Sequence, residues 1–234
     1  MDYDQAVLHF KIAQGLGFEP IESQVELGWT YFKKRDYYTA EQCFRDAMIE
    51  LRKRRNAERR KKHTPPDNNT SLSERCELSL KLNLYRAFAF AERGVRLHSA
   101  LNCTRRVELL IPQIDSAKRR NYYQWLHDCR GWIFLRAEQL GVSLKGKLSA
   151  QPYQDAIREL EQAVALTADS EAYLHLAQAY LGRARVIAKD GTDYIALALN
   201  ACEQARHGDL RGEYKPKLDD LEKQLNRMQS EIPK

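Results

Sequence analysis

The chain has 234 residues, and 43% of them are hydrophobic, which is enough apolar material for a packed core and excludes a disordered chain. Only seven prolines and eleven glycines occur, while helix-favouring residues fill long stretches, so helix is the expected class. The formal net charge of +6 at pH 7 is modest for this length, and most of the excess is concentrated in one basic run.

The cysteines and the apolar stretches indicate which compartment the protein occupies and whether it holds a cofactor. The five cysteines form no C-x-x-C pair, so we expect buried apolar thiols and no metal or cofactor. No apolar stretch approaches the length of a membrane span, and the first residues do not form a secretory signal. These features predict a cytoplasmic protein with reduced thiols. The cysteines are Cys43, Cys76, Cys103, Cys129 and Cys202.

Segments 24–31 and 40–47 each carry an apolar stripe at spacings of three and four residues, which is typical of two amphipathic helices. Gly28 lies in the first stripe, where the missing side chain would let the second helix approach closely. The pattern therefore predicts a hairpin of two helices closed face to face. The stripes consist of Leu27, Gly28 and Tyr31, and of Ala40, Phe44 and Ala47.

This Leu-Gly-x-x-Tyr and Ala-x-x-x-Phe-x-x-Ala pattern resembles the tetratricopeptide repeat family, with Gln24 in place of the usual tryptophan. First helices recur around Gly131 and Ala177. The second-helix stripe recurs as Tyr3, Ala6, Phe10 and Ala13, as Tyr153, Ala156, Leu160 and Ala163, and as Ile195, Ala198, Cys202 and Ala205. The resemblance implies an all-α fold, a right-handed α-solenoid of tetratricopeptide-type hairpins with a C-terminal capping helix.

The repeats predict one helical-repeat domain over residues 1–234. A second-type helix without a first helix opens it, a poor motif containing Leu84, Phe88 and Phe90 forms the second hairpin, and an amphipathic helix closes it. The orphan first helix either caps the stack or indicates a cut from a longer protein. The predicted parts are an orphan helix at 1–18, repeats at 21–62, 72–112, 117–168 and 170–207, and the capping helix at 211–230.

The family binds peptides in a concave groove, and the resemblance implies such a groove here. At 100° per residue, one set of first-helix side chains points away from the glycine-centred packing face. The alternative is that Trp29 and Trp132 contact the neighbouring repeat or the long irregular connections. Val25 and Trp29 occupy positions at which the family clamps a carboxylate, so we expect an apolar or mixed-charge peptide or a partner helix. The predicted groove residues are Val25, Trp29, Phe32, Lys33, Trp125, Asp128, Trp132, Leu135 and Arg136.

A basic run continues the second helix of the first full hairpin and ends before Pro65. One interpretation is an arm that contacts the phosphates of RNA or DNA. The other, which the absence of interleaved aromatic residues favours, is a solvated helix extension. The cations of this possible nucleic-acid contact are Arg52, Lys53, Arg54, Arg55, Arg59, Arg60, Lys61 and Lys62.

The sequence does not favour an enzyme. The triplet from His127 to Cys129 combines a base, an acid and a nucleophile, but adjacent helical side chains point about 100° apart and cannot form a catalytic chain. We expect a scaffold that binds a protein or peptide partner and has no membrane role. The alternatives are a nucleic-acid-binding helical-repeat protein and a regulatory or sensor module of a larger protein.

Overall fold

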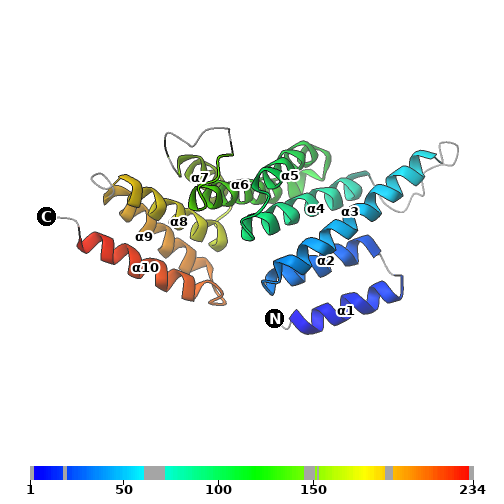
Figure 1. The fold of residues 1–234 in the computed structure, drawn as a ribbon, viewed down its shortest axis with the longest axis horizontal. Helices are drawn as coiled ribbons and strands as arrows, with labels where there is room; N and C mark the ends of the chain where they lie inside the picture. The colour runs from blue at the N-terminus through cyan, green and yellow to red at the C-terminus, as the bar shows by residue number, and fades with distance from the viewer. Residues whose placement is uncertain are drawn as a thin grey trace. The chain divides into compact units, whose positions relative to one another are not determined.

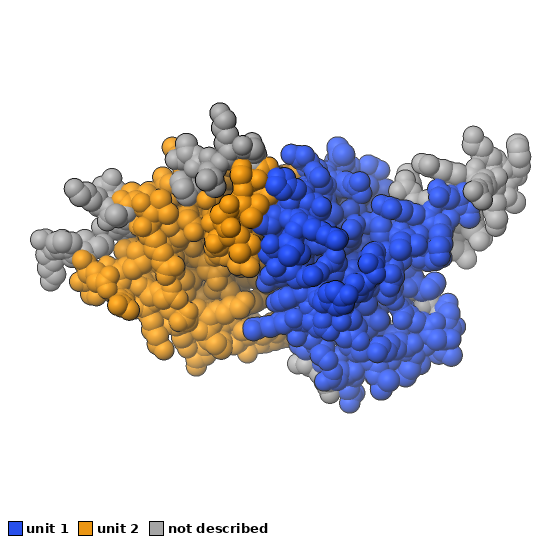
Figure 2. All heavy atoms as spheres, in the orientation of Figure 1, with its two compact units in different colours: residues 1–116 blue, residues 117–234 orange. Residues whose placement is uncertain are grey.

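The computed structural model describes residues 3–17, 20–60, 72–144, 151, 153–187 and 192–231, and all regular structure in these ranges is helical. The chain divides into two compact units, residues 1–116 and residues 117–234 (Figure 2). Each unit is a series of helices in which every helix packs on the next. This arrangement confirms the predicted all-α solenoid class.

In the first unit, neighbouring helices in the chain are neighbours in space (Figure 1). The helix α2 touches α1, α3 and α4, and α4 also packs on α3 and α5. A short 3₁₀ turn follows α5. The elements are α1 (Tyr3–Gly15), α2 (Pro20–Lys33), α3 (Tyr37–Arg60), α4 (Leu72–Glu92), α5 (Leu97–Leu110) and η1 (Ile111–Gln113).

In the second unit, α8 packs on α7 and α9, and α10 packs on α9 and α8. The helix α10 buries Leu218, Leu221 and Leu225 and exposes most of its other side chains. It is therefore the amphipathic capping helix that the sequence predicts. The elements are α6 (Ser116–Gln139), α7 (Gln154–Leu166), α8 (Ser170–Ile187), α9 (Thr192–Gly208) and α10 (Lys215–Ser230).

Two glycines lie where helices of one hairpin touch, as the repeat pattern predicts. A Cβ atom on Gly28 would lie 2.5 Å from Cε1 of Phe44 in α3, and one on Gly131 would lie 2.8 Å from Cδ2 of Leu160 in α7. Both distances are far below the usual carbon–carbon contact of about 3.5–4.0 Å. Only glycine fits at these positions without displacing the facing side chains.

The first helices α2, α4 and α6 end in the same kind of turn. A residue with a left-handed backbone follows each helix, and these residues are Arg35 with φ of 63°, Gly94 with φ of 63° and Gly141 with φ of 65°. The amide after each of them donates to a carbonyl five residues earlier, at 3.0, 3.2 and 2.8 Å. This pattern is the Schellman motif, in which glycine is the favoured residue.

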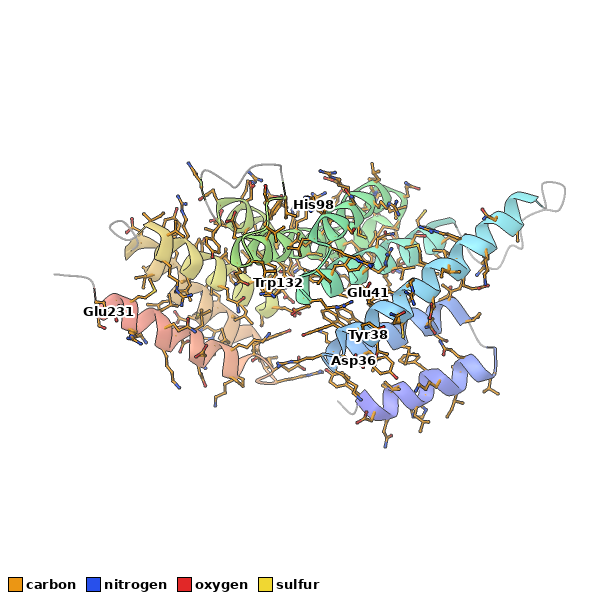
Figure 3. All side chains as sticks on the ribbon, in the orientation of Figure 1. Asp36, Tyr38, Glu41, His98, Trp132 and Glu231 are labelled. Carbon is orange, nitrogen blue, oxygen red and sulfur yellow. The ribbon has the colours of Figure 1, made fainter. Side chains whose placement is uncertain are left out.

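The start of α3 is fixed by polar contacts. Asp36 precedes the helix, and its Oδ1 accepts a hydrogen bond from the amide of Thr39 at 3.1 Å, which is the usual geometry of an N-cap. Hydrogen bonds from the side chain and the amide of Thr39 lower the pKa of the Asp36 carboxyl. Two residues further into α3, Glu41 forms ion pairs with Arg93 and Arg96 beyond the end of α4. Asp36 and Glu41 lie together at this end of α3 (Figure 3).

Candidate functional site

Trp29 is half-buried on α2 and stacks on a ring of the next first helix. Its centroid lies 4.3 Å from that of Tyr85 in α4, with 17° between the ring planes. Phe32 stacks on the same indole at 4.9 Å. The ammonium of Lys33, four residues along α2, lies 4.9 Å from the indole centroid, which is within cation–π range. Trp29 thus joins two hairpins and carries a cation beside it.

Two other predicted groove residues of α2 belong to this packing contact. Val25 is completely buried and Phe32 is 7% exposed, and both lie in the core cluster that also contains Leu82 and Tyr85 of α4. Their side chains therefore offer no surface to a ligand. The helical wheel placed both away from Gly28, and residues of the hairpin that follows cover them.

Trp132 repeats this arrangement in the second unit. Its ring stacks on His175 of the next first helix, α8, at a centroid distance of 4.3 Å and an interplanar angle of 18°. The guanidinium of Arg136, four residues along α6, lies 5.8 Å from the indole centroid. Trp132 is only 8% exposed, so the contact with the neighbouring repeat replaces the predicted groove contact. Figure 3 labels this residue.

Asp128 and Leu135 are also buried on α6, with exposures of 4% and 0%. Oδ1 of Asp128 lies 2.8 Å from Nδ1 of His175. Burial raises the pKa of the Asp128 carboxyl, and the nearby His175 opposes that shift. A paired buried carboxylate is a packing element, so Asp128, like Leu135, is unavailable to a ligand in this structure.

The triplet from His127 to Cys129 does not assemble into a catalytic group. Nδ1 of His127 lies 2.9 Å from Glu159 of α7, whereas the adjacent Asp128 pairs with α8 and Cys129 is completely buried. The three side chains leave α6 in different directions, as the helix geometry requires. The two polar contacts instead join α6 to both α7 and α8.

Four predicted residues keep accessible surface. Trp125 is 38% exposed and makes an edge contact with Tyr122, with ring centroids 5.4 Å apart. Lys33 and Arg136 are partly exposed beside their tryptophans, as is Trp29 itself. Trp29 and Lys33 lie in the first unit and Trp125 and Arg136 in the second. We call each pair, taken by itself, the first-helix face of its unit.

Tyr85 and His175, which complete the two stacks, were missed by the sequence reasoning. Tyr85 lies in a helix whose repeat motif is poor, and His175 makes no metal pair or other motif with a neighbouring residue. The only sequence signal was that Trp29 and Trp132 follow equivalent glycines. That signal predicts equivalent surroundings without naming the partner rings.

The described part of the basic run is exposed. The helix α3 has 24 residues against 14 in α2, so Arg52, Lys53 and Arg54 lie on its exposed second half. Residues 61 and 62 and the side chains at 55, 59 and 60 lie outside the described part, so the predicted contacts of Arg55, Arg59, Arg60, Lys61 and Lys62 stay predictions.

An open hollow of about 520 Å³ lies between the start of α2 and this half of α3. Lys53 and Arg54 line it, but so do Glu22 and Glu50, and the ammonium of Lys53 lies 3.2 Å from the Glu50 carboxylate. A phosphate would meet both signs of charge there. The hollow therefore does not favour the phosphate-binding interpretation.

The cysteines are free and buried, as predicted. Burial raises the pKa of the Cys43 thiol to about 11 and that of Cys202 to about 12. Across the described ranges, no group of three or more His, Cys, Asp or Glu side chains is arranged to hold a metal ion. None of the described helices is both long and apolar enough to cross a membrane.

Comparisons with known proteins add little. No protein-family model matches the chain, and no curated protein matches it. One solved structure, the TPR2AB domain of yeast Sti1 in complex with pHSP90, aligns over 96% of this chain and 92% of its own, with 13% sequence identity and a TM-score of 0.32. These values are too low to place the two chains in one family or to transfer a ligand.

Proposed function

We propose that the chain is a tetratricopeptide-type scaffold that binds a protein partner through a first-helix face. The observation that carries this proposal is Trp125, a 38% exposed indole on a rigid helix that also carries Arg136. Tryptophan and arginine are the residues most often found at the centres of protein interfaces. A partner that covered the exposed part of this ring would remove apolar surface from water.

The accessible chemistry suggests the kind of partner. Trp125 provides an apolar and polar anchor, because its ring is apolar and its indole nitrogen donates a hydrogen bond. Lys33 and Arg136 provide a positive charge beside an aromatic surface in each unit. A peptide or partner helix with apolar side chains and at least one carboxylate fits this combination.

The other functions are weaker proposals. Binding of nucleic acid would use Arg52, Lys53 and Arg54, which are exposed, but Lys53 is paired with Glu50 and no aromatic residue interrupts the run. A regulatory module of a larger protein has no supporting contact in the described residues. An absence of catalysis is likewise a proposal, supported by the separate partners of His127 and Asp128.

Site-specific photo-crosslinking tests the proposal. A photoreactive phenylalanine derivative replaces Trp125 in one variant and Leu210, which is 93% exposed in the same unit, in a matched control. We expect a crosslinked protein from position 125 and little from position 210 after irradiation in a cell extract. The Arg136→Glu change should reduce the yield at position 125. Equal yields at both positions, or a product that contains only nucleic acid, would contradict the proposal.

A further inference from the structure

Tyr38 differs from the other tyrosines of the chain in its exposure. The chain has twelve tyrosines, and the structure describes the burial of all of them. The others are buried or half-buried, whereas Tyr38 is 62% exposed. Tyr38 is therefore the tyrosine most accessible to an enzyme in solution.

Two arginines of the next hairpin reach the side of α3 that carries Tyr38. The guanidinium carbon of Arg93 lies 5.5 Å from the centroid of the Tyr38 ring. Glu41, about one helical turn further along α3, forms ion pairs with Arg93 and with Arg96, the second at 3.4 Å. Figure 3 shows Asp36, Tyr38 and Glu41 together at this end of α3. The two cations therefore share one carboxylate next to an exposed phenol ring.

The turn that carries these arginines is held by its backbone. The amides of Arg93, Gly94 and Val95 donate hydrogen bonds to carbonyls of the last turns of α4, at 3.2, 3.0 and 3.2 Å. The carbonyl of Arg96 accepts a hydrogen bond from the amide of Ala100 in α5 at 3.0 Å. The Arg93 and Arg96 side chains nevertheless stay 30% and 68% exposed. A guanidinium has five N–H donors, so each retains donors for a second anion.

From these observations we infer that Tyr38 is a phosphorylation site and that Arg93 and Arg96 bind the phosphate group that it receives. The phosphoryl donor is a nucleoside triphosphate, and the enzyme is a protein tyrosine kinase. The phenol oxygen of Tyr38 forms a bond to the γ-phosphorus, the bond from that phosphorus to the β,γ-bridging oxygen breaks, and a nucleoside diphosphate leaves. The phenol proton passes to a base of the kinase. The site contains no residue of either first-helix face and goes beyond the proposed function.

The charges around Tyr38 favour the modified form. A phosphotyrosine carries a charge of about −1.5 to −2 at neutral pH and three strong acceptor oxygens. Asp36 and Glu41 repel it, whereas Arg93 and Arg96 attract it, and the positive end of the α3 dipole lies close to Tyr38. Arginine binds phosphate through short, often paired hydrogen bonds. We therefore expect the two guanidinium groups to bridge the phosphate and the Glu41 carboxylate, which adds a contact between α3 and the turn after α4.

A kinase reaction on the whole chain tests the acceptor. The chain is incubated with a broad-specificity protein tyrosine kinase, ATP and Mg²⁺, and fragmentation of the tryptic peptide 36–45 separates Tyr37 from Tyr38. We expect Tyr38 to be modified about tenfold faster or more than any other tyrosine, because a half-buried ring reacts only after local opening. Tyr38→Phe should remove most of the incorporated phosphate. Tyr37→Phe, at the half-buried neighbour, is the matched control and should leave it unchanged.

A chain with phosphotyrosine inserted at position 38 during synthesis tests the two arginines without a kinase. Phosphorus NMR follows the second ionisation of the phosphate, whose pKa is ordinarily about 6. Nearby cations favour the dianion, so this pKa should be lower in the otherwise wild-type chain than in Arg93→Gln or Arg96→Gln, by about 0.5 or more. Arg105→Gln, at an exposed arginine within α5, is the matched control and should leave the pKa unchanged. Since Arg96 is 68% exposed, its variant keeps the test valid even if Arg93→Gln loosens the fold.

Either of two results would overturn the inference. The first is modification of Tyr38 that is absent, or no faster than that of the half-buried tyrosines, because the accessibility of the ring would then select nothing. The second is the same phosphate pKa in the wild type and in both the Arg93→Gln and Arg96→Gln variants. The phosphate would then have no binding partner on the turn after α4.

Discussion

Overpacking at Gly28 is the most direct test of the hairpin that organises the first unit. A Cβ atom at this position would lie 2.5 Å from Cε1 of Phe44 and 3.0 Å from Cβ of Cys43. To restore a normal contact, the Phe44 ring would have to move by about 1 Å or more. The ring is completely buried and lies 5.8 Å from the ring of Tyr85, so its displacement would disturb the packing around it.

The expected cost follows from two opposing effects. Overpacking of a buried contact costs about 1–3 kcal/mol, whereas replacing glycine by alanine within a helix gains up to about 1 kcal/mol. Gly28→Ala should therefore lower the free energy of unfolding by up to about 2 kcal/mol. Gly28→Leu, which adds three more carbon atoms, should reach about 3 kcal/mol, or roughly 6–12 °C in the melting temperature of a chain of this size.

Gly15→Ala is the matched control, because Gly15 lies at the end of α1 and a Cβ atom there would meet nothing within 4 Å. Its melting temperature, read by circular dichroism, should stay unchanged or rise slightly. If Gly28→Leu melted at the same temperature as the wild type, Gly28 would not lie at a close helix contact. The assignment of α2 and α3 as one repeat would then have to be abandoned.

Four further substitutions test other contacts. Trp132→Ala should lower the free energy of unfolding by about 3–5 kcal/mol, because the ring is buried. Trp125→Ala should cost less, about 1–2 kcal/mol, because the ring is 38% exposed and loses a smaller apolar area. Similar denaturant midpoints for both would contradict the assigned burial. Arg35→Gly should raise the stability by about 0.4–1 kcal/mol, because glycine adopts the left-handed turn without strain, and a lower melting temperature would argue against that turn. Asp36→Ala should cost about 1 kcal/mol at neutral pH through loss of the cap. The pKa of Asp36 is lower in the folded chain than in the unfolded chain. The stabilisation by its carboxylate is therefore fully present above the unfolded pKa of about 4 and is lost as the pH falls through the lowered folded pKa. The melting temperatures of Asp36→Ala and the wild type should converge in acid, and a constant difference down to pH 2 would count against the cap.

The features that the sequence predicted well are those fixed within a hairpin. Gly28 and Phe44 lie on consecutive helices that one short loop connects. The helical period alone places the two residues on the facing sides of these helices, so their contact could be inferred. Gly131 meets Leu160 in the same way although the connection between them is enlarged. The stripe of α10 was likewise visible because amphipathicity is a local property.

The features that the sequence did not predict depend on the next hairpin. The helical wheel shows that Trp29 points away from Gly28, but it does not show where α4 lies. The sequence therefore could not decide whether Trp29 lines a groove or packs on the next hairpin. The pairing of Asp128 with His175 joins residues 47 positions apart and follows no spacing rule. Solenoid interfaces between repeats are tertiary contacts, and a degenerate motif such as that of α4 removes the one signal that would locate them.

The five buried thiols can report where the chain opens locally. Cys43, Cys76 and Cys103 report on the first unit, while Cys129 and Cys202 report on the second. The thiolate attacks the alkylating reagent, so a buried thiol is modified only while its surroundings are transiently open. Mass spectrometry of a timed alkylation would therefore rank the opening rates of individual hairpins in the unmodified protein, without introducing a single label.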